Sequence, residues 1–471
     1  MAGVSQTAEV LIVGAGIMGV STAYHLARLG VGPVVVLERD TVCSGSTALA
    51  SGGIRHQYAN RLGVELTTHS IVTYERFKDE FGVDPNFRQH GYLILIGSEV
   101  ELAVARRSVA LQRSLGVHVE LLDAAATRAL CPYLNTDDLL GATYTPRDGY
   151  ADPYLCATAI AARARDLGVT IKQQHEVHGF LRHSDRVRGV TTAAGSFEAR
   201  ATVIATGAWS GVVGRLAGVD IPVSPHRRHK FMTAPFPASR IPAATPFIID
   251  PHTNFSLRRE GPGLLLGHGR RDEPDGFSTE IDRSLEPALI ERAIHRAPAL
   301  ADAELMRAWA GLYEMTPDQT GIVSAVPGVT GLHVIAGFSG HGFMHGPIAG
   351  QLMAEMLAHD HAVTMDAGPL DIGRFARGEA HVEPLTFVWA PRPWPERCRD
   401  DRAGCLDPRG AGPRRPARPG RPGERSHPHP ELQDGGDARR TLPRAVLSQA
   451  RLRGRPAGDR DRKSTRLNSS H

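Results

Sequence analysis

The chain has 471 residues and a formal charge of +4, but its charges are unevenly distributed. Residues 388–471 hold 20 Lys and Arg against 10 Asp and Glu, which leaves 34 basic and 40 acidic residues, a net charge of −6, in the first 387. An acidic body does not favour nucleic acid as a partner. Because no run of about 18 apolar residues occurs, we expect no transmembrane segment.

The last part of the chain, residues 388–471, is expected to lie outside the folded protein. It holds 12 of the 33 Pro and shows no apolar periodicity, so burial cannot offset its ordering entropy. The final residues, DRKSTRLNSSH, resemble the translation of a sequencing-library adapter. We interpret this disordered tail as frame-shifted and adapter-derived sequence. A genuine basic arm is the alternative.

Cysteine usage and the first residues both bear on location. Cys43, Cys131 and Cys156 show no Cys-x-x-Cys spacing, so neither a disulfide framework nor a metal site is predicted. An apolar strand begins by Glu9 without a basic segment before it, which argues against a secretory signal. We therefore expect a cytoplasmic protein.

A βαβ unit is predicted at the start of the chain. Residues 9–13 are a β-branched run that predicts a strand, and apolar residues at helical spacing from Ile17 predict a helix that Gly30 ends. The turn between them reads Gly14-Ala15-Gly16-Ile17-Met18-Gly19, the dinucleotide fingerprint. Its glycines permit a tight turn and bring backbone close to a pyrophosphate at the helix N-terminus.

A second strand, at residues 34–37, completes this unit and ends at Glu38. Glu38 follows Gly19 by 19 residues, close to the spacing of an acid that binds an adenosine ribose. Strand, helix, strand and acid together predict a bound dinucleotide. They do not choose between FAD and NAD.

The pattern then changes to short strands broken by Pro-rich turns. Residues 91–96 and 263–267 are examples, and they predict a mainly antiparallel sheet. Helices are predicted at residues 99–115 and 285–295.

Two further stretches are rich in small residues. Residues 45–55 (GSTALASGGIR) let backbone amides lie against an extended cofactor. Residues 335–344 (IAGFSGHGFM) follow a strand predicted at 332–335 and lead into a helix predicted from about Pro347.

Five motifs in order carry a family resemblance: the fingerprint, GSTALASGGIRHQY, ATGAWS (205–210), GLYEMTPD (311–318) and AGFSGHGFMHGP (336–347). From about Val10 to Phe387 the chain resembles the superfamily of sarcosine oxidase, glycine oxidase and D-amino acid oxidase. Its pattern is like that of sarcosine oxidase β-subunit-like FAD-dependent oxidoreductases.

The resemblance implies FAD and a mixed α/β fold of two domains. A Rossmann-like FAD-binding domain is expected from the discontinuous segments 1–85, 150–215 and 320–387. A mainly antiparallel substrate-binding domain is expected from 86–149 and 216–319, with substrate held between its sheet and the flavin.

The expected FAD contacts come from the fingerprint, the small-residue stretches and the ATGAWS motif. They are Gly14, Gly16, Ile17, Met18, Gly19, Glu38, Arg39, Ser46, Thr47, Ser51, Gly52, Gly53, Ile54, Val177, Thr206, Gly207, Trp209, Gly337, Ser339, Gly340, His341, Gly342, Phe343 and Met344. Backbone N–H groups from Ser339 to Met344, at a helix start, would stabilise negative charge on the reduced flavin.

Five residues are candidates for the chemistry. Arg55 matches an arginine that binds the substrate carboxylate in monomeric sarcosine oxidases, a role suited to a planar cation. Arg258 is a second candidate, on a strand expected to face the flavin. Tyr313 aligns with an active-site aromatic of the family, and His341 and His56 are placed to tune protonation near pH 7.

The departures from the family pattern also carry information. Relatives that tether flavin use a His where this chain has Leu49 or a Cys where it has Gly311, so non-covalent FAD is expected. Monomeric sarcosine oxidases have Lys at the positions of Met344 and Leu265. Loss of the oxygen-activating Lys at Leu265 weakens the case for O₂ as the acceptor, so a quinone, an electron-transfer protein or a partner subunit is at least an equal alternative. Loss of the Lys at Met344 weakens the case for carboxylate binding and for sarcosine itself as the substrate.

The predicted function is oxidation of the C–N bond of a small amino acid or N-methyl amino acid, with hydride transfer to flavin N5 and hydrolysis of the resulting imine. A 2-hydroxy-acid dehydrogenase on the same scaffold is one alternative. A non-catalytic FAD-binding assembly factor or subunit is another.

Overall fold

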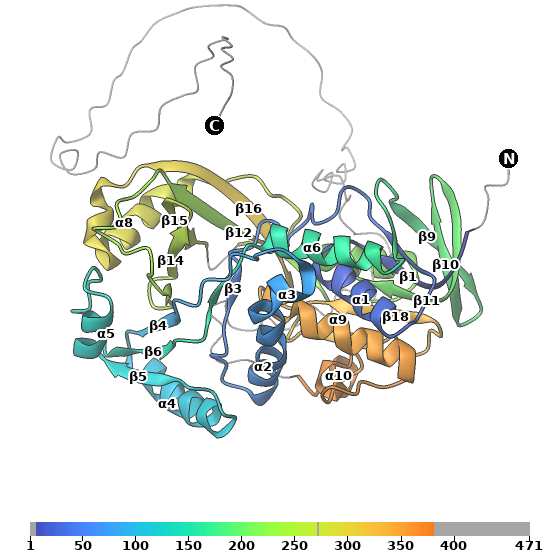
Figure 1. The fold of residues 1–471 in the computed structure, drawn as a ribbon, viewed down its shortest axis with the longest axis horizontal. Coiled ribbons are helices and arrows are strands. Elements are labelled where there is room, and N and C mark those ends of the chain that lie inside the picture. Colours follow the sequence, from blue (N-terminus) through green and yellow to red (C-terminus); the bar gives the residue numbers. More distant parts are fainter. Residues whose placement is uncertain (1–5, 271–272, 381–471) are drawn as a thin grey trace, which may run out of the picture.

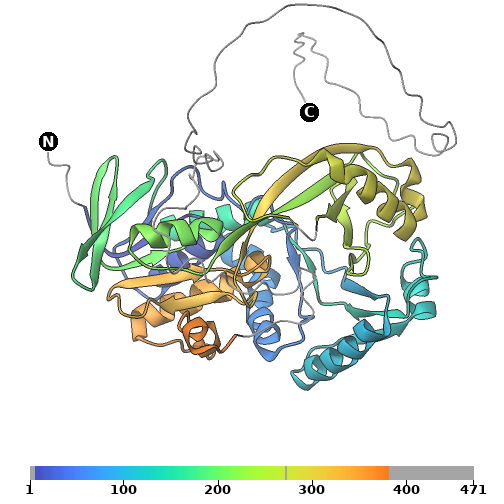
Figure 2. The ribbon, with the colours of Figure 1, turned by 180° about the vertical axis from the view of Figure 1, so that it is seen from behind.

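The computed structural model describes residues 6–270 and 273–380. The tail predicted at 388–471 lies outside the described residues. Two sheets organise the described chain, one in each half of the molecule, and they lie side by side in both ribbon views (Figures 1 and 2).

The first sheet has eight strands in the order β17-β18-β11-β1-β2-β8, with β10 and β9 continuing from β11. The pairs from β18 to β8 are parallel. Residues 10–13 of β1 and all of β2 are buried, as expected for strands covered on both faces. The strands are β1 (Gln6–Val13), β2 (Val34–Leu37), β8 (Thr170–Lys172), β9 (Val177–His183), β10 (Arg186–Thr192), β11 (Gly195–Ile204), β17 (Ile322–Ala325) and β18 (Leu332–Ala336).

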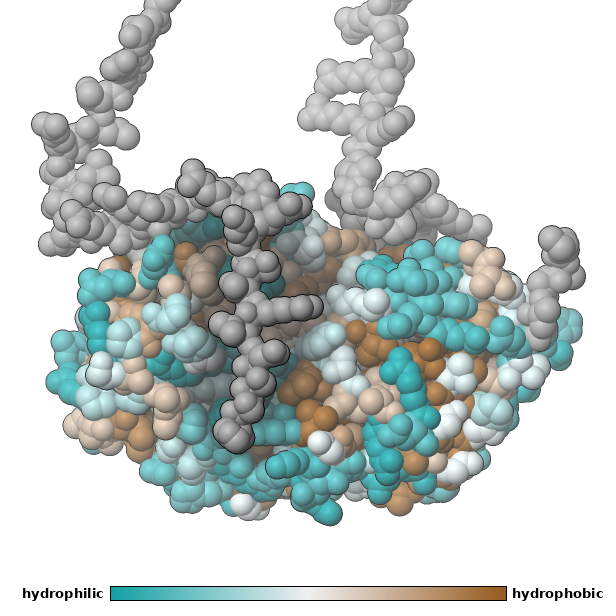
Figure 3. Space-filling view, turned by 45° about the horizontal axis from the view of Figure 1, so that its top comes forward, coloured by the Kyte–Doolittle hydropathy of each residue, from teal (hydrophilic) through white to brown (hydrophobic). Residues whose placement is uncertain are grey.

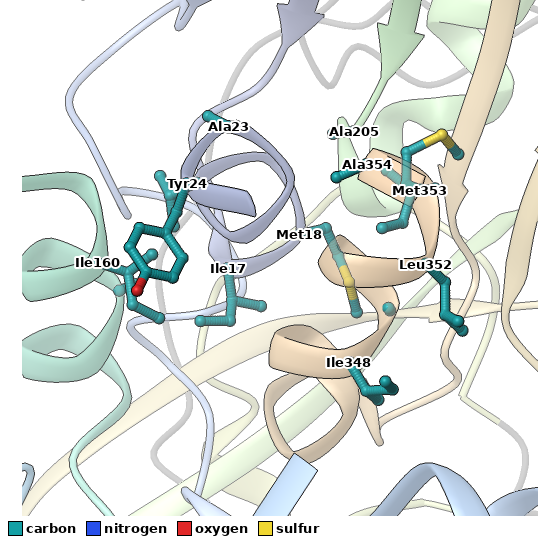
Figure 4. Close-up of a cluster of buried hydrophobic side chains, with 14 of the residues drawn as sticks. Ile17, Met18, Ala23, Tyr24, Ile160, Ala205, Ile348, Leu352, Met353 and Ala354 are labelled. Carbon is teal, nitrogen blue, oxygen red and sulfur yellow. The ribbon is translucent and has the colours of Figure 1, made fainter. Parts of the chain in front are cut away.

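Three helices pack beside this sheet: α1 (Ile17–Arg28), α6 (Pro153–Asp166) and α9 (Gly342–His359). Figure 4 shows α1 between the other two, with Tyr24 near Ile160 on one side and Met18 near Ile348 on the other. The packing of α1 and α9 requires glycine. A Cβ at Gly350 would lie 2.4 Å from the Ser21 Cβ, so the two backbones approach too closely for a side chain there.

The second sheet has the order β16-β12-β15-β14-β13-β4-β6-β5 and is antiparallel except for the pair β13–β4. An apolar cluster that includes Leu266, Phe231 and Leu289 joins it to α8 (Glu286–Arg296). The strands are β4 (Tyr92–Ile96), β5 (Glu120–Asp123), β6 (Gly141–Thr145), β12 (Ser224–Thr233), β13 (Phe247–Asp250), β14 (Phe255–Glu260), β15 (Gly263–His268) and β16 (Leu305–Met315).

The remaining elements connect the two halves or cover their edges. They are β3 (Gly53–Ile54), α2 (Arg61–Glu75), α3 (Phe77–Phe81), α4 (Glu99–Ser114), α5 (Ala124–Leu130), β7 (Gly149–Tyr150), α7 (Ser210–Leu216) and α10 (Arg374–Arg377). The fold class predicted from sequence, a Rossmann-like sheet with a mainly antiparallel second sheet, is confirmed.

One predicted boundary is wrong. The helix expected from about Pro347 begins at Gly342, and Pro347 lies inside it. A proline there leaves the carbonyl of Phe343 without its usual donor four residues later. The Tyr74 hydroxyl donates a hydrogen bond of 2.5 Å to that carbonyl, so a side chain on α2 replaces the missing backbone bond.

No helix within residues 6–270 and 273–380 is long and apolar enough to cross a membrane. On the face shown in Figure 3, hydrophilic and hydrophobic residues are interspersed over the described surface.

Candidate active site

A cavity of about 740 Å³ runs between the two sheets. One end is lined by the turn after β1 and the residues after β2, and its middle by the start of α9. The far wall consists of side chains from β12, β14, β15 and β16. The motifs that are distant in sequence therefore meet around one space.

The fingerprint turn forms the first end of this cavity. Gly14 has a φ of 106°, and a Cβ there would lie 2.5 Å from the carbonyl oxygen of Ala205. A Cβ at Gly19 would lie 2.0 Å from the carbonyl oxygen of Gly14, so this glycine permits close packing and does not itself line the cavity. The Thr47 hydroxyl oxygen accepts a hydrogen bond from Ile17 N–H at 3.2 Å, which ties the small-residue stretch to the start of α1.

Glu38 shapes the neighbouring subsite. Its two carboxylate oxygens accept from Ala15 N–H at 2.8 Å and Asp40 N–H at 3.0 Å, which holds the acid at the cavity wall. The Arg39 guanidinium lies 4.0 Å above the Trp209 ring, and that ring stacks on Phe277 at 5.5 Å. An acid beside a stacked aromatic suits a ribose with its attached base.

Glu314, at the end of β16, is a site residue that the sequence argument missed. Cβ atoms built on Gly207 and Gly342 would lie 3.4 and 3.2 Å from its carboxyl oxygens, so it sits between two cofactor motifs. Its Oε1 accepts from Phe338 N–H at 3.2 Å, whereas Oε2 has no partner within the described residues. Burial raises the pKa of Glu314 to about 7. The sequence feature that could have identified Glu314 is its position beside Tyr313 in the GLYEMTPD motif.

These features fit FAD. Gly14 and Gly16 leave room for a pyrophosphate at the N-terminus of α1, and Glu38 faces the same end. The unpartnered oxygen of Glu314 lies further along, where a cofactor chain with hydroxyl groups would supply hydrogen-bond partners. Beyond it, α9 begins at the cavity, and the first N–H groups of a helix lack acceptors within the helix.

Arg55 lies in the middle of the cavity wall and is only 3% exposed. Its guanidinium donates to the Gln57 carbonyl and, at 3.0 Å, to Nε2 of His341. It also lies 4.3 Å from the ring of Tyr58. Burial and the Arg55 charge hold the pKa of His341 well below its usual range, so His341 is neutral and accepts this hydrogen bond.

Two of the predicted candidates lie outside the cavity lining. His56 is turned away and its Nδ1 lies 2.5 Å from Asp148, whose second oxygen accepts from the His56 backbone. Arg258 on β14 donates to the Ser51 carbonyl at 2.7 Å and pairs with Glu260 at 2.6 Å. Both side chains support the neighbouring loops rather than face the cavity.

The far wall carries Tyr313 from β16 with Arg228 and Lys230 from β12. The Arg228 guanidinium lies 5.2 Å from the ring of Tyr313. Burial raises the pKa of Tyr313, while Arg228 and Arg55 both act to lower it. Sequence reasoning missed both cations on β12, although Lys230 stood out as one of few lysines before the tail.

Most of the expected cofactor contacts surround this cavity. The residues that line it are Gly14, Gly16, Ile17, Met18, Glu38, Arg39, Ser46, Thr47, Ser51, Gly52, Gly53, Val177, Thr206, Gly207, Trp209, Ser339, Gly340, His341, Gly342, Phe343 and Met344. Gly19, Ile54 and Gly337 lie behind them, where a Cβ at Gly337 would meet Thr316 at 2.3 Å.

The fold and cavity define a dinucleotide-binding protein with a separate sheet over the cofactor site. The model of the family described as "FAD dependent oxidoreductase" matches residues 9–356. The chain belongs to this family, which confirms the resemblance and identifies FAD as the cofactor type.

Similar proteins include the sarcosine oxidase subunit beta of Arthrobacter sp, which is 30% identical over 79% of this chain and 91% of its own length. The mitochondrial sarcosine dehydrogenase of Mus musculus is 31% identical over 78% of this chain, a match that spans 41% of that protein. Among solved structures, L-proline dehydrogenase from P. horikoshii superposes with a TM-score of 0.76 at 29% identity, covering 80% of this chain and all of the other.

Proposed function

We propose that this protein oxidises the C–N bond of a small amino acid or N-methyl amino acid. The observation that carries the proposal is the place of Arg55: a buried guanidinium on the wall of the FAD cavity, between the start of α9 and the second sheet. A planar cation there suits a substrate carboxylate. Similarity to proteins named for sarcosine and proline oxidation supports the same class.

Each residue contributes to positioning. Arg55 binds the carboxylate, and neutral His341 holds the guanidinium in place by accepting its hydrogen bond. Tyr313, whose ring packs against Gly340 beside His341, confines the substrate beside the cofactor. The start of α9 directs N–H groups and the positive end of its dipole toward the cavity, where they stabilise negative charge.

FAD, when bound, supplies the acceptor for a hydride from the carbon next to nitrogen. The imine that remains hydrolyses in water. We propose that FAD is held non-covalently, because the two tether positions carry no nucleophile. A Cβ at Gly311 would lie 3.0 Å from the Leu49 Cβ, so the two positions face each other and bring together only an aliphatic side chain and a glycine.

The acceptor, the location and the domain boundaries belong to the same proposal. O₂, a quinone, an electron-transfer protein or a partner subunit reoxidises the flavin.

A cytoplasmic setting is supported by Cys43, Cys131 and Cys156, which are buried free thiols. The FAD-binding domain comprises 1–85, 150–215 and 320–387, and the segments between them form the substrate-binding domain.

An anaerobic titration tests the function. The FAD-loaded protein is mixed with sarcosine, proline, glycine and a panel of 2-hydroxy acids while flavin absorbance is followed. Bleaching by amines supports the proposal. Bleaching only by hydroxy acids would replace it with hydroxy-acid oxidation, and no bleaching across the panel would favour a non-catalytic role.

Arg55→Ala tests the carboxylate role. We expect the apparent Kd for the amino acid to rise about 10- to 100-fold, as for loss of a charge-assisted hydrogen bond of about 1.5–3 kcal/mol. Lys78→Ala, which removes an exposed cation on α3, serves as the control. Unchanged affinity in Arg55→Ala would remove Arg55 from the site.

A further inference from the structure

Lys230 and Arg228 form a basic pair on the part of the cavity wall that β12 contributes. The two residues are two positions apart on β12, so their side chains emerge on the same face of the sheet, and both line the cavity. Lys230 is opposite Gly267 of β15 in the antiparallel register. A Cβ at Gly267 would lie 3.0 Å from the Lys230 Nζ and 2.2 Å from the Ser256 Oγ. The ammonium group therefore extends over the glycine into the cavity.

The charge of Lys230 is not compensated within the described chain. Its ammonium makes no hydrogen bond or ion pair with residues 6–270 and 273–380. Burial, Arg258 and Arg228 lower the pKa of Lys230 to about 8, so the surroundings are already positive. A cation at the cavity wall without a protein partner is available to a ligand, and an anion placed beside it would offset the positive charge of its surroundings.

Five acids of the described chain line the cavity: Glu38, Asp40, Glu176, Asp250 and Glu314. Asp250 pairs with Arg296 at 2.7 Å, and Glu38 is held by backbone N–H groups at the nucleotide end. Glu314 has a pKa of about 7 and therefore carries only part of a negative charge at neutral pH. None of these carboxyl groups is bonded to Lys230.

This basic pair is separate from the group around Arg55. Lys230 lies beside Gly267 and Ser256 of the second sheet, whereas Arg55 contacts Gln57, Tyr58 and His341. The cavity wall thus carries two cationic groups, one at Arg55 and one at Lys230. A ligand with a single carboxylate satisfies only one of them.

We propose that Lys230, with Arg228 beside it, is a second anion-binding subsite and that the substrate is an amine with two carboxylates. This rests on the proposed function: Arg55 takes the carboxylate next to the reacting carbon, and Lys230 takes the distal one. The reaction is the same oxidation of a C–N bond, and the second carboxylate acts only in recognition.

The test begins with binding, which does not depend on turnover. The full chain loaded with FAD is titrated with propionate and butyrate, and with succinate and glutarate, and the perturbation of the flavin spectrum gives each Kd. We expect the dicarboxylates to bind at least tenfold more tightly. Lys230→Met removes this preference and Lys230→Arg retains it, while Lys78→Met, an exposed site on α3, behaves as wild type.

Reduction kinetics complete the test, with aspartate, glutamate and iminodiacetate compared with alanine and sarcosine. We expect Lys230→Met to lower kcat/KM at least tenfold for the dicarboxylic amines, through KM, and to leave the others unchanged. An equal loss for both groups, or no loss, would overturn the subsite. If no amine reduces the wild-type flavin while dicarboxylates still bind through Lys230, the proposed function fails and the subsite stands.

Discussion

Tyr74→Phe tests whether the start of α9 depends on a hydrogen bond from another helix. The Tyr74 hydroxyl is buried and donates at 2.5 Å to the carbonyl of Phe343, the oxygen that Pro347 cannot serve. Removing the hydroxyl leaves this buried acceptor without a donor. A buried unsatisfied polar group costs about 1–3 kcal/mol, so we expect the free energy of unfolding to fall by about that amount.

Tyr74→Phe should also weaken the binding of FAD. Phe343 and Met344 line the cavity, so a loosened first turn of α9 weakens FAD binding as well as folding. Urea unfolding followed by circular dichroism measures the first effect, and fluorescence titration of the apoprotein with FAD measures the second. We expect both the free energy of unfolding and the affinity for FAD to fall.

Pro347→Ala supplies the matched control. Alanine has a backbone N–H that can donate to the Phe343 carbonyl, so the Tyr74 hydroxyl is no longer its required donor. In the Pro347→Ala background, Tyr74→Phe should therefore cost less than in the wild type, with a coupling energy of about 1 kcal/mol or more. Equal costs in the two backgrounds would refute the reasoning, because the hydroxyl would then act through something other than this carbonyl.

Two further predictions concern Gly350 on α9 and Glu314 on β16. Gly350→Ala places a Cβ 2.4 Å from that of Ser21, so α1 and α9 must separate; we expect a loss of about 1–3 kcal/mol in unfolding free energy and weaker FAD binding, whereas Gly276→Ala, at a position with open space, changes neither. A normal FAD affinity in Gly350→Ala would show that the contact between these helices does not shape the site. Because the folded pKa of Glu314 is raised from 4.5 to about 7, its contribution to the stability of the apoprotein is complete below pH 4.5 and is lost as the pH rises through about 7. The difference in unfolding free energy between wild type and Glu314→Gln should therefore change across this window, and a difference independent of pH would count against a raised pKa.

Local sequence patterns were sufficient to predict the first strands and the first helix of the fold. Residues 34–37 form β2 as predicted, and the helix from Ile17 ends at Arg28, just before Gly30, which has a φ of 72°. These features depend on side-chain periodicity and on the conformational freedom of glycine, both of which are readable along the chain. The fingerprint and its acid are likewise local, and so the cofactor class followed from them.

Features that depend on contacts between distant segments could not be predicted from the sequence. The start of α9 was placed late because proline normally ends or precedes a helix, and only the fold brings the Tyr74 hydroxyl to the exposed carbonyl. Arg258, the second candidate for the carboxylate, and His56, a candidate for tuning protonation, instead bond to Ser51 and Asp148 and do not line the cavity. Which groups such a side chain contacts is decided by packing between distant segments, which leaves no periodic signal.

The sequence by itself thus predicted a dinucleotide cofactor, since glycine turns and an acid at fixed spacing are readable along the chain. Only the tertiary structure decided which charges face the substrate. Lys230 and Arg228 come from β12, Arg55 from the loop after β3 and Glu314 from β16, and they share one cavity because two sheets meet there. Charge in a protein interior depends on distance and burial, and neither quantity is fixed by separation along the chain.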